Sequence, residues 1–101
     1  MIPKDMLEQV ARRFKLLGEP VRLELLKVLS EHGEATVQAL VEATGQSHAN
    51  VSKHLRLMLA EGFVARRQEG LYAYYRIDDP TLQALCLLVC GRLREELEAA
   101  Q

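Results

Sequence analysis

Residues 36–59 read TVQALVEATGQSHANVSKHLRLML, and this stretch decides the fold. Thr36 is placed to cap a short helix, because a threonine hydroxyl can accept a hydrogen bond from a backbone N–H group of the first turn. The turn at residues 44–46 contains Gly45, and Ser47 can cap a second helix. Two short helices joined by such a turn, with polar side chains opening the second, are typical of a helix-turn-helix.

Two more helices are predicted before this stretch. Apolar residues recur at three- and four-residue spacing over residues 4–17, which predicts an amphipathic helix that stops at Gly18. Pro20 suits the first turn of a second helix, which is heavily apolar and ends at Gly33.

The periodicity changes after Gly62, which closes the fourth helix. Two short β-favouring runs flank the polar, glycine-containing loop at residues 66–70 and predict a hairpin. A fifth helix follows and runs to about Ala99, with Asp79 as its cap and Pro80 in its first turn. The expected fold is therefore mainly α, a winged helix-turn-helix of five helices plus a wing, forming one domain over residues 1–101.

The fifth helix is apolar on all sides between Ala84 and Cys90. Such a helix has no solvent face, and a chain of 101 residues has too little mass to surround it. We therefore expect one side to pack on its own domain and the other side on a second subunit.

Composition narrows the class of protein. Apolar residues make up 49% and charged residues 27%, and the net charge is −1, which excludes a disordered chain and a uniformly basic one. No apolar run approaches the roughly 20 residues of a membrane span, and residues 1–5 lack the apolar core of a signal peptide. We expect a cytoplasmic protein without a membrane partner, whose two cysteines are thiols.

Positive charge is concentrated in residues 46–76. This segment carries five Lys or Arg residues against two acidic ones, whereas residues 77–101 carry two against five. A local basic patch is the electrostatic signature of a DNA-binding protein, although a solvated surface of uneven charge has the same composition.

The candidate DNA contacts lie at the start of the fourth helix and on the wing. In the helix-turn-helix geometry, the first residues of the second helix reach base edges in the major groove, and a wing reaches the neighbouring backbone or minor groove. The polar candidates on the helix are Gln46, Ser47, His48, Asn50, Ser52, Lys53 and Arg56, and those on the wing are Arg66, Arg67 and Gln68.

Three stretches together resemble the ArsR/SmtB family of winged-helix repressors. Residues 16–26 (LLGEPVRLELL) resemble the entry to the family's second helix, and residues 50–56 (NVSKHLR) resemble its recognition helix. Residues 62–64 (GFV), 66–70 (RRQEG) and 74–77 (YYRI) resemble its wing. The resemblance covers about residues 6–97. It implies a homodimeric repressor, paired through its first and last helices, that leaves a double-stranded DNA operator when an inducer reaches a sensor site.

Two metal sites known in this family are not intact here. Where one site has two cysteines on the third helix, this chain has Thr36 and Gln38. Another site uses Asp and His on the last helix, and the last helix here has Asp78 and Asp79 but no His. The resemblance therefore implies no resident metal at these positions, and no cofactor is required.

Cys86 and Cys90 are the candidate sensor thiols. Their spacing of four places them on one helix face with Cβ atoms about 5–6 Å apart, which is too far for a disulfide without local unwinding. A polysulfide bridge, a disulfide between subunits or a soft ion such as arsenite or copper(I) fits better. The alternative is that both are small core residues on the stripe with Leu82, Val89, Leu93 and Leu97.

Three classes of function remain open on these residues. The first is a sequence-specific repressor that is released from DNA when an inducer, either reactive sulfur or an oxidant, modifies Cys86 and Cys90. Two alternatives keep the repressor but change the role of the cysteines. In one they bind a soft metal such as arsenite, and in the other they are structural. The second is a winged-helix module that binds protein. An enzyme is not expected, because the chain has no Cys-x-x-Cys pair and no glycine-rich phosphate loop.

Overall fold

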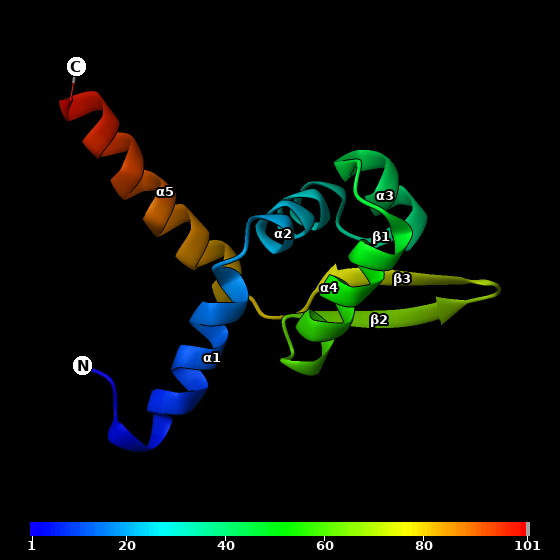
Figure 1. The fold of residues 1–101 in the computed structure, drawn as a ribbon, viewed down its shortest axis with the longest axis horizontal. Helices are drawn as coiled ribbons and strands as arrows, with labels where there is room; N and C mark the ends of the chain where they lie inside the picture. Colours follow the sequence, from blue (N-terminus) through cyan, green and yellow to red (C-terminus); the bar gives the residue numbers. More distant parts are fainter. Residues whose placement is uncertain (101) are drawn as a thin grey trace.

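The computed structural model describes residues 1–100, and Gln101 of the expected domain lies outside the described residues. The mainly α fold with a β-hairpin wing is confirmed (Figure 1). The helices are α1 (Leu7–Leu17), α2 (Pro20–His32), α3 (Val37–Thr44), α4 (His48–Ala60) and α5 (Thr81–Ala99). The strands are β1 (Ala35–Thr36), β2 (Val64–Glu69) and β3 (Tyr72–Ile77).

The predicted helix caps at Thr36 and Ser47 are confirmed. The Thr36 hydroxyl accepts a hydrogen bond from the Ala39 backbone N–H at 3.1 Å, and Ser47 Oγ accepts one from the Asn50 N–H at 3.1 Å. Each cap satisfies a backbone donor that has no partner within the first turn of its helix. The start of α4, which carries most of the candidate DNA contacts, is thereby fixed.

Two predicted helix starts are wrong by a few residues. Lys4–Met6 form a 3-10 turn, closed by the Met6 N–H donating to the Pro3 carbonyl at 3.0 Å, and α1 begins only after it. At the other end, the Asp79 carboxylate accepts from the backbone N–H of Thr81 at 2.9 Å. Thr81 is therefore the first helical residue, and Pro80 stands before α5 rather than in its first turn.

The sheet has three strands in the order β1-β3-β2, all antiparallel. The hairpin of β2 and β3 was predicted, but its loop was misplaced: residues 66–69, expected in the loop, belong to β2, and the turn is at Gly70 and Leu71. Strand β1 was not predicted. This two-residue strand pairs Ala35 with Tyr75 and Thr36 with Tyr74, so it depends on a partner about 40 residues away in the sequence. It joins the end of α2 to the base of the wing.

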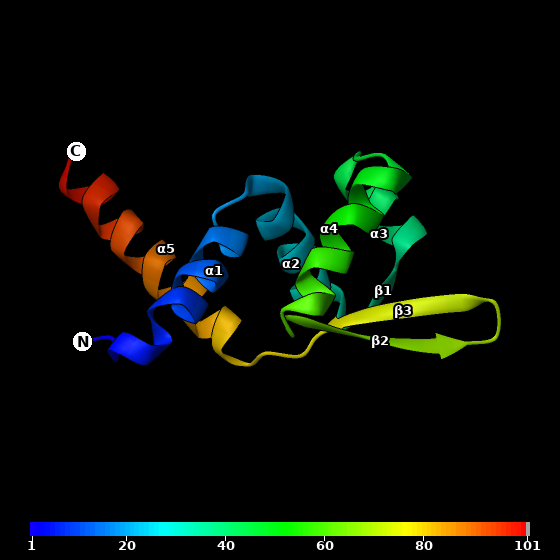
Figure 2. The ribbon, with the colours of Figure 1, turned by 60° about the horizontal axis from the view of Figure 1, so that its bottom comes forward.

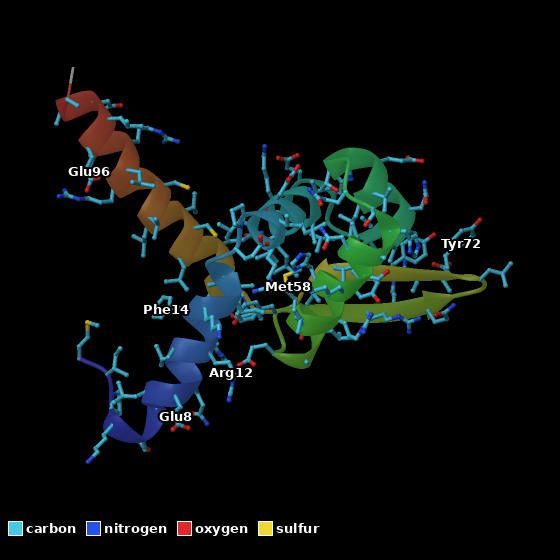
Figure 3. All side chains as sticks on the ribbon, in the orientation of Figure 1. Glu8, Arg12, Phe14, Met58, Tyr72 and Glu96 are labelled. Carbon is cyan, nitrogen blue, oxygen red and sulfur yellow. The ribbon has the colours of Figure 1, made fainter. Side chains whose placement is uncertain are left out.

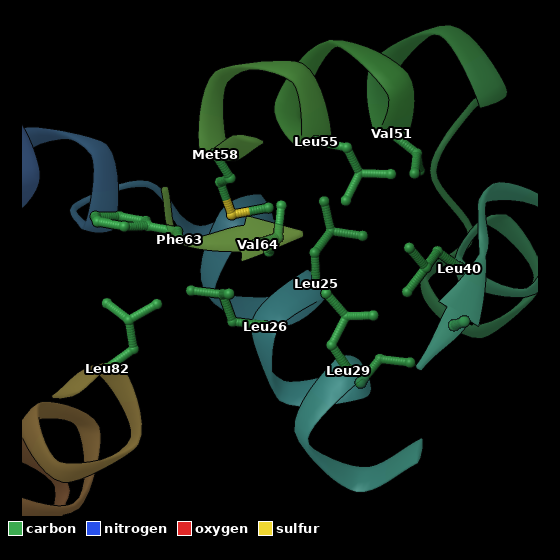
Figure 4. Packing of buried hydrophobic residues seen from close by; sticks show 12 residues of the cluster. Leu25, Leu26, Leu29, Leu40, Val51, Leu55, Met58, Phe63, Val64 and Leu82 are labelled. Carbon is green, nitrogen blue, oxygen red and sulfur yellow. The ribbon is translucent and has the colours of Figure 1, made fainter. Parts of the chain in front are cut away.

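The core lies between α2, α3, α4 and the base of the sheet (Figure 4). Helix α4 contributes Val51, Leu55 and Met58, which pack against leucines of α2. The fully buried side chains are Leu25, Leu29, Leu40, Val51, Leu55, Met58, Phe63 and Val64. These residues hold α4 and the wing in a fixed relation.

Helices α1 and α5 extend away from this core, opposite to the tip of the wing (Figures 1 and 2). Together with the wing they give a molecule of 48 × 40 × 21 Å. Of the nineteen residues of α5, only Leu82 is buried. Within the described residues, no helix is both long and apolar enough to cross a membrane.

Candidate nucleic-acid interface

The turn between α3 and α4 is held by short-range hydrogen bonds. Gly45 adopts a φ of 72°, a left-handed conformation that a residue with a Cβ adopts only with strain. The Thr44 hydroxyl donates to the Leu40 carbonyl at 2.7 Å and accepts from the Gln46 N–H at 3.3 Å. This turn sets the direction in which α4 leaves α3.

Helix α4 has an apolar inner face and a polar outer face. Val51, Leu55 and Met58 are buried in the core. His48, Lys53 and Arg56 are exposed on the same helix. Because residues three to four apart share a helix face, Lys53 and Arg56 lie on one side of the helix while Val51, Leu55 and Met58 lie on the other. The helix can therefore present its polar side chains to another molecule without disturbing the core.

The side chains predicted to contact DNA at the start of α4 differ in their exposure to solvent. Ser47 is exposed, whereas Gln46, Asn50 and Ser52 are half-buried. The Asn50 side-chain amide donates to Gln46 Oε1 at 2.8 Å, so these two side chains orient each other. The remaining amide groups of both are the kind of donor and acceptor that pairs with base edges.

The wing places its two neighbouring arginines on opposite faces of the sheet. Side chains alternate along a strand, and Arg66 is paired with Tyr75 while Arg67 is paired with Tyr74. Tyr75 packs against the core, so Arg66 points to the core side of the sheet. Arg66 Nη2 donates to Gln68 Oε1 at 2.9 Å on that same face. Figure 2 shows α4 lying beside the paired strands β2 and β3.

Arg67 is held by three neighbours on the outer face. Its guanidinium donates to both carboxylate oxygens of Glu34, at 3.0 and 2.5 Å, and to Glu69 Oε2 at 2.6 Å. It also lies 4.6 Å from the centre of the Tyr74 ring. The hydrogen bond from Arg67 holds the pKa of Glu34 below 4.5, and both carboxylates raise the pKa of Arg67. This cluster attaches the wing to the turn before β1.

Sequence reasoning identified Arg67 but missed Glu34. The two residues are 33 positions apart, and only the pairing of β1 with β3 brings them together. The sequence contains one signal for the short strand that positions Glu34: Thr36 follows Glu34 and Ala35 and is β-branched, and β-branched residues favour strands. This signal was missed because Thr36 was interpreted only as a helix cap. Of the wing candidates, Arg66, Arg67 and Gln68 are all exposed, and their contacts to DNA stay predictions.

The cysteines lie on the second surface of the molecule. Both are free thiols; Cys86 is half-buried and Cys90 is exposed. They line an open groove of about 740 Å³ between α1, α2 and α5, together with apolar side chains such as Phe14, Leu26 and Leu93. Figure 3 shows Phe14 projecting from α1 beside α5 and away from Met58 in the core.

The residues at the third-helix metal position make other contacts in this structure. Thr36 caps α3, and the Gln38 amide donates to Glu42 at 3.2 Å. Among residues 1–100, no group of three or more His, Cys, Asp or Glu side chains is placed to hold a metal ion.

Comparison with known proteins identifies the family. The family model described as bacterial regulatory protein, arsR family, matches residues 19–66, which run from the start of α2 into the wing. An HTH-type transcriptional regulator from Methanocaldococcus jannaschii is 33% identical over 82 residues, covering 81% of this chain and 92% of that protein. The chain belongs to the ArsR family. It is a DNA-binding transcriptional repressor of this family, as its residues predicted.

Solved structures of ArsR-family regulators share the whole fold. The homodimeric winged helix-turn-helix DNA-binding domain of a possible ArsR-family regulator from Mycobacterium bovis has a TM-score of 0.83 and 37% identity, covering 94% of this chain and 87% of that one. The antimony-specific transcriptional repressor AntR has a TM-score of 0.81 and 32% identity, covering 98% and 88%. The expected winged helix-turn-helix is confirmed.

Proposed function

We propose that this ArsR-family chain is a homodimer that binds a two-fold symmetric operator through α4 and the wing of each subunit. The observation that supports this best is the division of α4 into a buried apolar face and an exposed face with His48, Lys53 and Arg56. A helix of this kind can enter the major groove while its inner face stays packed. Its capped N-terminus also favours an adjacent phosphate.

The proposed dimer interface is the apolar surface of α1 and α5. Leu87 is 74% exposed and Leu93 52%, although both are large apolar residues in the middle of a helix. A continuous apolar patch of this kind is rare on a monomer and marks an association site. The homodimeric state of the similar Mycobacterium bovis domain supports a second copy as the occupant. Two recognition helices can then lie about 34–36 Å apart, one turn of DNA.

The charge distribution supports an orientation of the dimer in which α4 and the wing face the DNA. The basic segment 46–76 contains α4 and the wing, whereas the acidic segment 77–101 contains α5. Because the two segments lie at opposite ends of the molecule (Figure 1), DNA is attracted to one end and repelled from the other. Binding is expected to weaken steeply with salt.

The direct test uses a duplex enriched by the chain from a random-sequence pool. Fluorescence anisotropy is expected to show tight, salt-dependent binding that Arg56→Ala weakens by about 1–3 kcal/mol. Arg92→Ala is the matched control, because Arg92 is exposed on α5 and pairs only with Glu95 and Glu96 among residues 1–100. No enrichment at low salt, or an equal loss from both variants, would contradict the proposed interface.

We further propose that Cys86 and Cys90 are the sensor. They lie on the face of α5 that joins the subunits, so a change there can alter the angle between the two α4 helices. A coupling of about 1–3 kcal/mol, or 5–150-fold in affinity, is typical of such a link. In the single chain Cys90 is the more exposed of the two thiols.

Reactive sulfur species fit the spacing of these thiols. The Cys90 thiolate attacks a sulfur atom of a polysulfide, an S–S bond of the polysulfide breaks, and the shortened polysulfide leaves as an anion. The Cys86 thiolate then attacks the chain of sulfur atoms on Cys90 and releases hydrosulfide. The two thiols are oxidised and the polysulfide is reduced. A bridge that includes extra sulfur atoms spans the gap that a plain disulfide does not.

A soft metalloid is the second candidate inducer, supported by the likeness to the antimony-specific repressor AntR. Two thiols of one chain offer too few ligands, but the two subunits together supply four. The same anisotropy assay separates the candidates, with one sample treated with polysulfide and another with antimonite under reducing conditions.

The thiol test compares the wild type with the double variant Cys86→Ser, Cys90→Ser. The variant is expected to bind DNA as tightly as the reduced wild type and to ignore both reagents. The wild type is expected to lose affinity 5–150-fold with the true inducer. If either reagent releases the double variant from DNA, Cys86 and Cys90 are not the sensor. The same conclusion follows if the wild type stays bound to DNA after both treatments.

A further inference from the structure

His54 is the one buried polar or charged side chain among the described residues. It lies on the inner face of α4, beside Val51, Leu55 and Met58, and only 6% of it is exposed. Its Nδ1 accepts a hydrogen bond from Arg22 Nε–H at 3.1 Å. Because Nδ1 is the acceptor, the ring is neutral with its proton on Nε2.

Arg22 reaches from this histidine to the end of α1. Its Nη1 donates to the Leu16 carbonyl at 3.1 Å, in the last turn of α1. Its backbone N–H donates to the Glu19 carboxylate at 3.1 Å, which caps α2. One side chain therefore connects the last turn of α1, the start of α2 and the middle of α4.

Protonation of His54 would break this connection. Nδ1 would become a donor facing the Arg22 donor, and two positive charges would stand 3.1 Å apart. Burial lowers the pKa of His54 below 6.5; the positive charges of Arg22 and Lys53 lower it as well, while the Glu19 carboxylate acts in the opposite direction. The bond forms while His54 is neutral and is lost as the pH falls through the lowered pKa of His54.

We propose that Arg22 and His54 form a positioning pair that fixes the recognition helix α4 relative to α1, and that the pair acts only while His54 is neutral. The inference rests on the proposed use of α4 to bind DNA and of α1 in the dimer. It adds a hydrogen-bonded link between the two surfaces, beside the apolar contacts of the core. Neither residue contacts DNA: His54 faces inward, and Arg22 is half-buried between helices.

The test is the pH dependence of binding to the duplex enriched from the random-sequence pool. Wild-type affinity is expected to fall as the pH is lowered from 7.5 through the acidic range in which the protein stays folded, by up to about tenfold once His54 is protonated, because a buried donor then loses its acceptor. His54→Asn keeps an acceptor oxygen where Nδ1 stands but does not titrate. It is expected to match the wild type at pH 7.5 and to lose the pH-dependent decrease.

Two further variants separate positioning from other effects. His32→Asn removes an exposed histidine at the end of α2, outside the proposed DNA-binding surface, and is expected to keep the pH-dependent decrease. His54→Leu removes the acceptor and is expected to bind about tenfold more weakly already at pH 7.5. The ¹⁵N chemical shifts of His54 in the wild type are expected to show an unprotonated Nδ1 and a protonated Nε2 at pH 7.5.

The outcomes distinguish this inference from the proposed function. If the pool yields a duplex but His54→Asn keeps the wild-type pH dependence, the positioning pair is wrong and DNA binding stands. The pair is also wrong if His54→Leu folds and binds like the wild type at pH 7.5. If no duplex is enriched, the use of α4 to bind DNA fails, and the inference fails with it.

Discussion

Helices α4 and α5 have similar apolar content but opposite surroundings. Helix α4 has thirteen residues and buries four of them, Val51, His54, Leu55 and Met58. Helix α5 has nineteen residues and buries only Leu82. Its other large apolar residues, among them Leu87, Leu88 and Val89, are exposed. The chain therefore has one half that completes its own core and another half that does not.

The difference shows where each half obtains its stability. The half formed by α2, α3, α4 and the sheet contains all the fully buried side chains (Figure 4). The half formed by α1 and α5 has its apolar side chains on the outside, around the groove with Cys86 and Cys90. Burying that surface against a second copy adds roughly 25 cal/mol per Å² of apolar area. A sensor placed in the second half can thus change the assembly without unfolding the first.

The largest effect is expected from a charge on the α5 surface. Leu93→Asp places a carboxylate where the second copy packs, and an uncompensated buried charge costs about 3–5 kcal/mol. Sedimentation at micromolar concentration is expected to show a shift from dimer to monomer. Leu71→Asp is the matched control, because Leu71 is 95% exposed at the tip of the hairpin. If both variants stay dimeric, α5 is not the interface.

A second substitution addresses the half that completes its own core. Leu55→Ala removes a side chain that is 0% exposed, and it is expected to lower the free energy of unfolding by about 2–5 kcal/mol. Denaturant unfolding measures this loss in the monomeric Leu93→Asp background, where dimer dissociation does not contribute to the free energy of unfolding. In that background Leu88→Ala, on the exposed face of α5, should change the stability by less than about 0.5 kcal/mol. If Leu55→Ala and Leu88→Ala lower the free energy of unfolding equally, the two halves do not differ in the way proposed.

Two glycines provide a smaller comparison in the same background. Gly45→Ala forces a Cβ into a φ of 72° at the end of α3 and is expected to destabilise by about 1–2 kcal/mol. Gly91→Ala lies inside α5, where an added Cβ meets nothing within 4 Å. It is expected to stabilise the helix by about 0.5–1 kcal/mol, because alanine favours helices. Thermal unfolding measures both changes, which are expected to have opposite signs. If Gly45→Ala leaves the stability unchanged, the left-handed geometry of the turn is contradicted.

The smallest effect concerns the two neighbouring arginines of the wing. Arg66→Gln is expected to lower the slope of log affinity against log salt by about 1, as loss of one phosphate contact does. Arg67→Gln is expected to leave the slope unchanged, because its guanidinium is occupied by Glu34 and Glu69. A salt titration of DNA binding measures both. A reduced slope for Arg67→Gln would show that this side chain leaves its carboxylates to contact DNA.

Much of the fold follows from local features of the sequence. The caps Thr36 and Ser47 and the left-handed Gly45 act within a few residues, so their consequences can be predicted from spacing. The exposed apolar surface of α5 was also predicted, because a helix that is apolar on all sides must be covered by something else. The stripe from Leu82 to Leu97, considered as core, is buried only at Leu82 within the chain.

Apart from local errors at helix starts and at the hairpin loop, the features that were missed depend on contacts distant in sequence. Strand β1 exists because Ala35 and Thr36 reach Tyr75 and Tyr74. The bond between Arg22 and His54 joins residues 32 positions apart on two helices. Neither residue type nor spacing predicts such a pair, since each side chain alone has many possible partners. The three-dimensional fold supplies the partner, and with it the role of the residue.

The division into two halves is tested most directly by amide hydrogen exchange of the wild type and of Leu93→Asp. In the wild-type dimer, amides of residues 87–97 are expected to be protected. In the monomeric variant these amides should exchange rapidly, while those of residues 51–58 keep their protection. Equal protection of α5 in the two proteins would contradict the account, as would a simultaneous loss of protection in α4.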